Sequence, residues 1–426
     1  MKPAELKAAL LGGKFDDRLT CLYGAAALPA QKARYAAALE SFEALYGADR
    51  DADFYSVAGR SELSGNHTDH NHGCVIAASI DLDIIAVAAK SEGNGIRVKS
   101  EGFREDVVDL ETFAEPDPAR RECSAALIAG MAAGFRKTGY RAGGFDAYTT
   151  SNVLKGSGIS SSAAFEDMIG NILNHLYNGG RVDNVEIAKI AQYAENVFFG
   201  KPCGLMDQVA CAVGGIVAID FEDPKRPEIE KINFDITGAG YNLCIVNTGG
   251  NHADLTDDYA SVPAEMKAVA AAFGKPVLRD VEESEVLAKI AELRSSVGDR
   301  AVLRALHFYA ENRRVAKQKA ALRAGDLSAF FENVVASGRS SFCYLQNVYT
   351  TKNTSEQGLS LALCLAERIL AGKRAAWRVH GGGFAGTVQA FVPSGETDSF
   401  RAAMDAVFGK GACMVLRIRP VGAVRV

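Results

Sequence analysis

The sequence of 426 residues lacks long uninterrupted apolar runs. Its longest apolar candidate, residues 74–89, is interrupted by Asp81 and Asp83. It therefore does not provide the ~20 apolar residues that a membrane-spanning helix needs. The N-terminus carries two early lysines without a sustained apolar segment, which predicts a short helix closed by Gly12 and Gly13 and no signal peptide. We expect no membrane partner.

Paired cysteines and an excess of positive charge are also lacking. The nine cysteines are an odd number, and no C-x-x-C pair occurs among them. This usage disfavours a disulfide framework or a zinc ribbon, and it predicts mostly buried thiols in a reducing, cytoplasmic compartment. The formal net charge of −5 gives a nucleic-acid role no electrostatic support. An anionic ligand would have to be held by local hydrogen-bond donors.

Helical and strand patterns alternate along the chain, which favours an α/β or α+β fold. Residues 80–87 are the most strand-like early segment. A Pro- and charge-rich link at 222–231 lies between two further strand patterns, 214–221 and 241–248, which we interpret as a strand pair. Near this link we place the boundary between two domains, 1–225 and 226–426. Helices are expected at 31–46, 117–137, 161–178, 184–199, 299–323, 327–338, 355–371 and 399–408.

One glycine motif argues against a dinucleotide fold. Gly381, Gly383 and Gly386 form a literal G-x-G-x-x-G, but a strand pattern, TVQAFV, follows instead of the required helix. A Walker A loop is also absent, because no Gly-Lys pair in the sequence is followed by Ser or Thr.

A better phosphate-binding candidate begins at Gly156. Glycines and serines here precede an expected helix, whose first N–H groups and dipole would attract an anion without net positive charge. The hydroxyls of Ser161 and Ser162 could add hydrogen bonds or a magnesium ligand. An ordinary serine-rich cap before an alanine-rich helix explains the same pattern, and the segment alone does not separate the two interpretations.

Histidines cluster at positions 67, 70 and 72, around Asp69. No distant Cys or His pair completes a tetrahedral zinc set. Side chains that offer both donors and acceptors at short range suit a ligand rich in hydroxyl groups. The cluster therefore favours recognition of a polar small molecule over a metal site.

Four segments together resemble galactokinases of the GHMP kinase superfamily. They are GRSELSGNHTDHNHG at 59–73, GSGISSSA at 156–163, AENVFFGKPCGLMDQ at 194–208 and RVHGGGFAG at 378–386. The family patterns that they resemble are G-R-x-N-L-I-G-E-H-T-D-Y-N-x-G, G-G-G-L-S-S-S-A, A-E-x-x-F-x-G-x-P-C-G-I-M-D-Q and G-G-G-F-G-G. Their order and spacing match over nearly the whole chain.

The resemblance implies an α+β, two-domain GHMP kinase fold, with a ribosomal-S5-like N-terminal α/β domain and a ferredoxin-like C-terminal domain. It implies an ATP-dependent kinase that phosphorylates the anomeric hydroxyl of galactose. Its partners would be the sugar and ATP, with no nucleic acid. We expect a monomer or a weak homodimer.

Roles for single residues are implied by the same resemblance. Asp207 would lie beside the anomeric hydroxyl as a base or an electrostatic orienter, next to Arg60. Because an Asp beside an Arg has a lowered pKa, we favour orientation over full proton abstraction. Glu195 and the serine at 161 or 162, with Ser162 preferred, would hold Mg²⁺. The substrate would contact Asn66, His67, Asp69, Tyr259, Gly382 and Gly383. The nucleotide would contact Gly156, Ser157, Gly158, Ile159, Ser160, Ser161, Ser162 and Ala163.

Three departures from the first pattern concern substrate choice. Glu62 replaces the family's Asn, Asn66 replaces the Glu that helps to bind the C6 hydroxyl, and His70 replaces a Tyr. A site without that Glu would tolerate a C6 carboxylate better, so galacturonate or N-acetylgalactosamine stays open as the substrate. Residues 339–356 also depart from the family. An inactive sugar-binding homologue is the remaining alternative.

Overall fold

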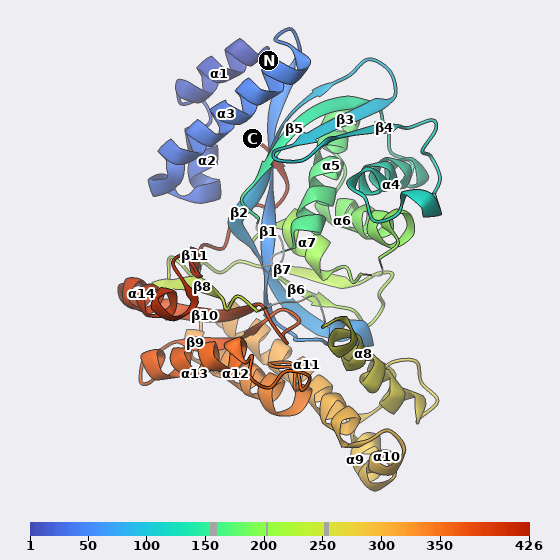
Figure 1. Cartoon of the computed structure of the whole chain (residues 1–426), viewed down its shortest axis with the longest axis vertical. Coiled ribbons are helices and arrows are strands. Elements are labelled where there is room, and N and C mark those ends of the chain that lie inside the picture. Colours follow the sequence, from blue (N-terminus) through green and yellow to red (C-terminus); the bar gives the residue numbers. More distant parts are fainter. Residues whose placement is uncertain (154–159, 202, 251–254) are drawn as a thin grey trace.

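The structure is a computed structural model that describes every residue except 154–159, 202 and 251–254. Its mixture of helices and sheets confirms the predicted α+β class. The described strands form one sheet of eight strands and one of four. In Figure 1 the larger sheet occupies the upper part of the molecule and the smaller sheet lies below it, among the C-terminal helices.

The larger sheet has the strand order β12-β1-β2-β5-β3-β4, and β2 also pairs with β6, which pairs with β7. All pairings are antiparallel except that between β3 and β5. The strands are β1 (Ala52–Ser64), β2 (Cys74–Lys90), β3 (Gly95–Ser100), β4 (Glu105–Asp109), β5 (Phe145–Ser151), β6 (Ile216–Asp220), β7 (Glu228–Ile232) and β12 (Val424–Arg425).

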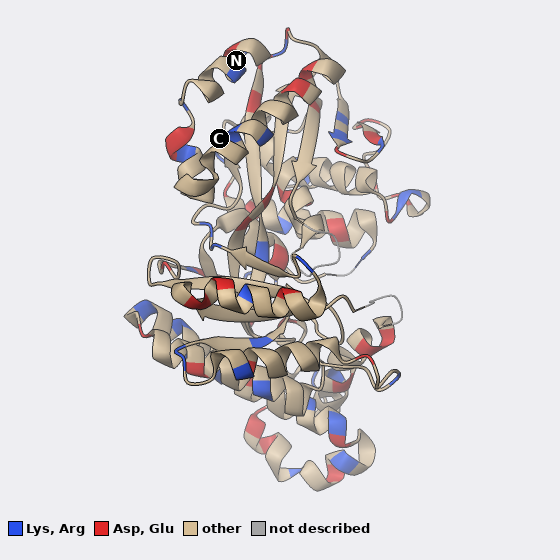
Figure 2. Ribbon diagram, turned by 60° about the vertical axis from the view of Figure 1, so that its left-hand side comes forward, with Lys and Arg blue, Asp and Glu red and all other residues tan. Residues whose placement is uncertain are grey.

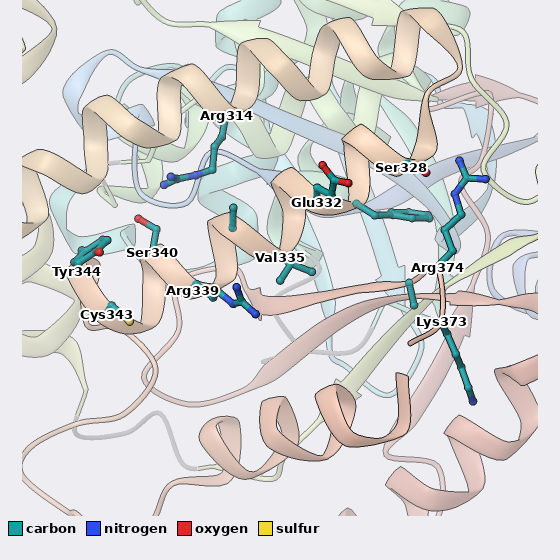
Figure 3. Close-up of a pocket in the computed structure, with 13 residues that line it drawn as sticks. Arg314, Ser328, Glu332, Val335, Arg339, Ser340, Cys343, Tyr344, Lys373 and Arg374 are labelled. Atoms are coloured by element: carbon teal, nitrogen blue, oxygen red, sulfur yellow. The ribbon is translucent and has the colours of Figure 1, made fainter. Parts of the chain in front are cut away.

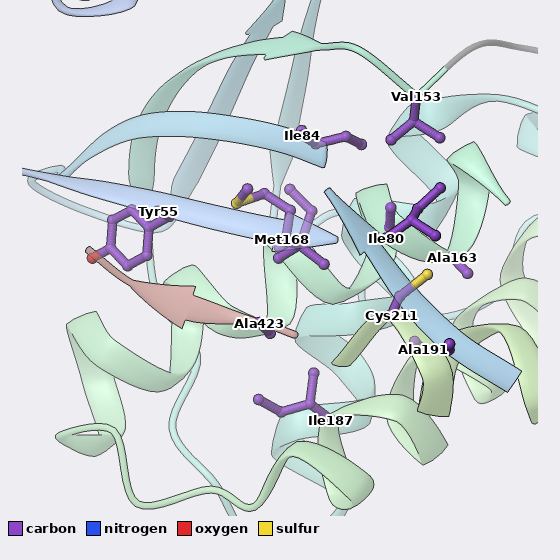
Figure 4. Close-up of a cluster of buried hydrophobic side chains, with 14 of the residues drawn as sticks. Tyr55, Ile80, Ile84, Val153, Ala163, Met168, Ile187, Ala191, Cys211 and Ala423 are labelled. Atoms are coloured by element: carbon purple, nitrogen blue, oxygen red, sulfur yellow. The ribbon is translucent and has the colours of Figure 1, made fainter. Parts of the chain in front are cut away.

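Helices cover both faces of this sheet. One face packs on α1 (Pro3–Leu11), α2 (Asp16–Tyr23) and α3 (Leu28–Tyr46) through a buried cluster that includes Phe42 and Phe54. The other face packs on α4 (Ser124–Lys137), α5 (Ser161–Asn178), α6 (Asn184–Tyr193) and α7 (Met206–Val213). Figure 4 shows Tyr55 and Ile84 from the sheet beside Met168 and Ile187 from α5 and α6. This apolar core fixes the strand ends and helix starts that carry the site.

The smaller sheet has the order β11-β8-β10-β9, and all its pairings are antiparallel. Its strands are β8 (Tyr241–Asn247), β9 (Ala376–His380), β10 (Thr387–Pro393) and β11 (Cys413–Leu416). It packs on α12 (Leu327–Ser340), α13 (Gly358–Leu370) and α14 (Thr397–Phe408). A separate cluster of helices comprises α8 (Thr256–Ala271), α9 (Glu283–Ala288), α10 (Ile290–Ser296) and α11 (Asp299–Ala324).

Short 3₁₀ turns and two π-helical turns complete the described elements. The 3₁₀ turns are η1 (Ala25–Ala27), η2 (Asp69–Asn71), η3 (Pro118–Arg120), η5 (Leu278–Asp280) and η7 (Ser394–Glu396), and the π-helical turns are η4 (Ala194–Phe199) and η6 (Ser341–Leu345). No helix in the described part of the chain is both long and apolar enough to cross a membrane. Basic and acidic residues are mixed along the helices that Figure 2 displays, in keeping with the small net charge.

The chain crosses between the two sheets more than once. The expected pairing of the strand patterns at 214–221 and 241–248 is wrong: β6 pairs with β2 and β7, whereas β8 pairs with β10 and β11. Neighbouring strand patterns often pair, but here the intervening β7 occupies the partner position beside β6. Both β7 and β12 belong to the larger sheet. The division after residue 225 stays a prediction.

Two helix predictions agree closely with the structure, and both helices end at a glycine with positive φ. The predicted helix at 161–178 is α5, and that at 31–46 is α3, which ends before Gly47 in a left-handed conformation (φ 90°) that favours glycine. The helix predicted at 117–137 is shorter, because α4 begins at Ser124 after a 3₁₀ turn. The predicted helix at 184–199 ends as the π-helical turn η4.

Candidate active site

A cavity of about 220 Å³ lies between the end of β1, the loop that follows it, the start of α7 and the turn between β9 and β10. Three of the four predicted segments, 59–73, 194–208 and 378–386, supply the described lining. Its lining consists of Arg60, Glu62, His67, Asp69, His70, Cys203, Gly204, Met206, Asp207, Gly381 and Gly382.

A larger cavity, of about 670 Å³, lies elsewhere, beside α11 and α12. Figure 3 shows Arg314 extending from α11 toward Ser340 and Tyr344, with Arg374 near the other end. Its described lining contains none of the predicted site residues. Size alone does not identify a functional site. The predicted site residues line the smaller cavity, so we take that cavity as the candidate active site.

Arg60 and Asp207 form a two-pronged ion pair in the wall of the smaller cavity. Arg60 Nε donates to Asp207 Oδ1 at 2.7 Å and Arg60 Nη2 donates to Asp207 Oδ2 at 2.9 Å. The Arg60 side chain is buried, whereas that of Asp207 is 33% exposed. Such a fork fixes the carboxylate in one orientation. The sequence placed these residues together through the resemblance alone, since 147 positions separate them.

The charge state of Asp207 follows from its surroundings. Burial alone would raise the pKa of Asp207, but the charge of Arg60 and the hydrogen bonds from Arg60 and Ser160 outweigh it. The pKa of Asp207 therefore lies below its ordinary value, and the group is an anion at neutral pH. It is well placed to orient a hydroxyl group and is a weak base.

The start of α5 approaches the same carboxylate. Ser160, in a left-handed conformation (φ 57°), precedes the helix, and its Oγ donates to Asp207 Oδ2. Ser161 and Ser162 are half-buried in the first turn, and Ala163 is buried in the core. The predicted nucleotide ligands Gly156, Ser157, Gly158 and Ile159 lie outside the described residues. The start of α5 therefore lies beside Asp207 in the wall of the cavity.

Buried carboxylates lie behind this helix start. Gln208 Nε2 donates to Glu195 Oε2 at 2.9 Å and to Glu166 Oε2 at 3.2 Å. Lys201 Nζ lies 3.6 Å from Glu195 Oε1. Burial and the nearby Glu195 raise the pKa of Glu166. Within the described residues, Oε1 of Glu166 and Oε1 of Gln208 are buried without a hydrogen-bond partner.

These oxygen atoms suit a hard cation. No three His, Cys, Asp or Glu side chains of the described residues form a complete metal cluster. Mg²⁺, however, commonly takes one or two carboxylates and completes its shell with water and substrate phosphates. The carboxylate Glu195 and the unpartnered oxygens beside it therefore fit a magnesium ion shared with a nucleotide.

The other wall of the cavity is the glycine turn between β9 and β10. His67 Nε2 lies 2.9 Å from the Gly382 carbonyl, and Tyr259 donates from its hydroxyl to the Gly383 carbonyl at 2.7 Å. A Cβ on Gly382 would lie 2.3 Å from the Tyr259 ring. Tyr259 thus supports the turn from outside and is absent from the cavity lining. Burial lowers the pKa of His67 to about 4, so its imidazole is neutral at pH 7.

Asn66 lies behind the cavity, and this differs from the expected direct contact with the substrate. Its side chain has no exposed surface, and it is not among the lining residues. Asn66 Nδ2 donates to Glu62 and to the Gly381 carbonyl, and Asn66 Oδ1 accepts from Ser341 and Asn347. Because every polar position of the amide is used, Asn66 shapes the wall instead of pointing at a ligand.

Asp69 does line the cavity, beside the start of α7. A Cβ on Gly204 would lie 2.8 Å from Asp69 Oδ2, so a larger residue there would displace the Asp69 carboxylate. The sequence interpretation assigned no site role to Glu62, Met206 or Cys203, although all three fall inside the quoted segments. Glu62 was noted only as a departure from the family pattern.

Comparisons with known proteins agree with this geometry. Residues 126–215 match the family described as "GHMP kinases N terminal domain", and residues 40–90 match "Galactokinase galactose-binding signature". The chain is 31% identical to the galactokinase of Streptomyces lividans over 355 residues, covering 82% of this chain and 84% of that protein. It is 29% identical to the galactokinase of Streptomyces coelicolor over 384 residues, covering 89% and 94%.

A solved structure has the same fold. The galactokinase of Lactococcus lactis in complex with galactose superposes with a TM-score of 0.75 at 24% identity, covering 91% of this chain and 98% of that one. The likeness confirms the predicted GHMP kinase fold.

Proposed function

Since the chain belongs to the galactokinase family, we propose that it transfers the γ-phosphoryl group of ATP to the anomeric hydroxyl of galactose, forming galactose 1-phosphate. The observation that carries this assignment is the Arg60–Asp207 fork in the wall of a small polar cavity. Phosphoryl transfer needs little covalent chemistry from the protein; it needs positioning and charge stabilisation.

Asp207 orients the reacting hydroxyl. Its carboxylate is exposed to the cavity on one side and is held by Arg60 on the other. Because its pKa is lowered, Asp207 accepts a hydrogen bond from the hydroxyl through the approach to the transition state. The proton passes to Asp207 only as the new bond from the sugar oxygen to the γ-phosphorus forms and the bond from that phosphorus to ADP breaks. Arg60 keeps Asp207 ionised and offsets negative charge that develops on the transferring group.

Magnesium belongs to the proposal as the partner of ATP. Glu195 and Ser162 would hold it, with Glu166 close by through the shared amide of Gln208. When bound, the ion supplies charge neutralisation at the phosphates. The N–H groups at the start of α5 supply further donors for phosphate oxygens. We place the enzyme in the cytoplasm, as a monomer or weak homodimer, and its nine free cysteines support a reducing compartment.

The test is a substrate panel. Purified protein is incubated with Mg-ATP and with galactose, N-acetylgalactosamine, galacturonate, glucuronate or arabinose, and ADP release is followed. We expect the highest kcat/KM with galactose. A clear preference for another sugar would keep the reaction and change the substrate. The absence of turnover with every sugar would favour an inactive sugar-binding homologue.

A further inference from the structure

The end of β1 brings a second acidic side chain to the cavity. Between Arg60 and Glu62 the strand pairs regularly with β2, so these two side chains lie on the same face of β1, about 7 Å apart along it. Ser61, between them, points the other way and contacts His380 and Gln389. Glu62 lines the cavity although only 5% of its surface is exposed.

One oxygen of Glu62 is fixed by the protein. Oε1 accepts from Arg378 Nη2 at 2.6 Å and from Asn66 Nδ2 at 3.2 Å. Arg378 has no exposed side-chain surface, and its remaining nitrogens donate to the carbonyls of Val379 and Leu63. The carboxylate is therefore held in a set orientation by a cation that cannot move away.

The other oxygen of Glu62 is available. Among the described residues, none donates a hydrogen bond to Oε2, and this atom is not one of the fully buried, unpartnered oxygens. A partly accessible carboxylate oxygen in the wall of a polar cavity can accept a hydrogen bond from a ligand. Because Oε1 is fixed, this acceptor is preorganised.

We propose that Glu62 Oε2 accepts a hydrogen bond from a hydroxyl group of the sugar and thereby makes the cavity selective for neutral sugars over uronates. This inference rests on the proposed function and extends it to the substrate class. Glu62 and Asn66, two of the three departures from the family pattern, are hydrogen-bonded to each other. The family's Glu is Asn66 here, but a carboxylate still lies beside this position, because Glu62 provides one from β1.

Charge in the cavity supports the same selectivity. Three lining side chains are carboxylates, Glu62, Asp69 and Asp207, and Arg60 is the one arginine or lysine in the described lining. Arg60 is already committed to Asp207 by two hydrogen bonds. Glu62 is paired with Arg378 behind the wall, so a ligand carboxylate would add a negative charge beside these carboxylates and find no arginine or lysine of the described lining left to pair with it.

Titration calorimetry with the wild-type protein tests this without any substitution. We measure binding of galactose, galacturonate and galacturonamide, the last being the uncharged counterpart of the uronate. We expect galacturonate to bind at least about tenfold more weakly than galacturonamide. Equal binding of the two would overturn the proposal.

The variant Glu62→Gln identifies the contact. Loss of a hydrogen bond to a charged acceptor should weaken galactose binding about tenfold, with a larger change in KM than in kcat. In a series of 2-, 3-, 4- and 6-deoxygalactose, one compound should bind the variant and the wild type equally, because it lacks the hydroxyl that Glu62 accepts. An equal loss for every sugar would mean that Glu62 only maintains the wall, and the proposal would be wrong.

Two controls keep the outcomes separate. Glu62→Gln leaves Arg378 with a neutral partner, so thermal melting is used to check that the variant folds. If it does not fold, the binding of galacturonate and galacturonamide to the wild-type protein tests the proposal. Binding of galactose without phosphorylation would contradict the proposed function and leave the role of Glu62 intact. Phosphorylation of galacturonate as efficiently as galactose would contradict the role of Glu62 and leave the kinase assignment intact.

Discussion

The two sides of the cavity are built in different ways. The Arg60 side consists of Arg60, Asp207 and Ser160, and all three belong to the larger sheet and its helices. The Asn66 side consists of Asn66 and the residues that hold it, Asn347 and Ser341, which come from the C-terminal half of the chain. The first side is organised by one ion pair, and the second by the amide of Asn66, which links Glu62 to segments distant in the sequence.

This difference separates chemistry from selection. An ion pair fixes the protonation and direction of Asp207, which the reaction needs, and depends on two side chains. The hydrogen-bond network around Asn66 sets the shape of the other wall and depends on the fit between two parts of the molecule. Changes on the Arg60 side should therefore affect kcat, whereas changes on the Asn66 side should affect KM and stability.

The largest effect should follow from Asp207→Asn. An amide has nearly the same shape but cannot act as an anion beside the reacting hydroxyl, and its NH₂ group conflicts with Arg60. We expect kcat to fall about 10²-fold or more, with galactose binding largely retained. Stopped assays of ADP release and calorimetry measure the two quantities separately. A variant that keeps most of its kcat would exclude both roles of Asp207.

A smaller kinetic effect is expected for Arg60→Lys. Lysine keeps the positive charge but cannot form the two-pronged contact, so kcat should fall about tenfold. The pKa of Asp207, held low by Arg60 in the native protein, should rise. Only the anionic form of Asp207 is active. Activity should therefore disappear at a higher pH in Arg60→Lys than in the native protein when the pH is lowered. Profiles of kcat/KM between pH 4 and 8 measure the shift.

The matched control is Arg97→Lys. Arg97 Nε donates to Asp146 Oδ1 at 2.6 Å, an ion pair of similar length on β3 and β5 outside the cavity lining. Its pH profile should coincide with that of the native protein. An acid limb that stays in place in Arg60→Lys would show that a group other than Asp207 controls it.

The Arg60 side could be predicted from the sequence and most of the Asn66 side could not. The segments that carry Arg60 and Asp207 are short and distinctive, so a resemblance brings them together, and the serines at 160–162 mark the start of α5 although Ser160 bonds to Asp207 and does not cap the helix. Asn66, by contrast, meets Asn347, 281 residues away, through contacts that leave no periodic pattern. The substitution at position 66 alone therefore predicts a site that tolerates a C6 carboxylate, whereas the structure places the Glu62 carboxylate in the wall.

The failed strand pairing has a similar cause. Two strand patterns that follow one another in the sequence often pair, but the sequence does not reveal that the segment between them contributes β7. Local propensity identifies a strand, whereas its partner depends on which neighbour offers a matching edge. The same limit applies to the network around Asn66.

The smallest effect on kcat and a clear effect on stability should come from Gly383→Ala. Gly383 has φ +80°, and a Cβ there would lie 1.9 Å from the Asn347 carbonyl oxygen, which also accepts from the Phe384 N–H. Moving Asn347 would break its hydrogen bond to Asn66, so KM should rise several-fold while kcat stays near the native value.

Strain in the Gly383→Ala variant should also lower the free energy of unfolding by about 2 kcal/mol or more. The control is Gly325→Ala, which is left-handed (φ 71°, ψ 15°) and whose added Cβ would have only Phe234 Cε2 within 4 Å, at 3.9 Å, so it carries mainly the backbone cost of about 1 kcal/mol. Thermal melts and kinetics of both variants measure the difference. If the two variants lost equal stability and kept equal KM, the contact of Gly383 with Asn347 would have no part in holding the Asn66 side.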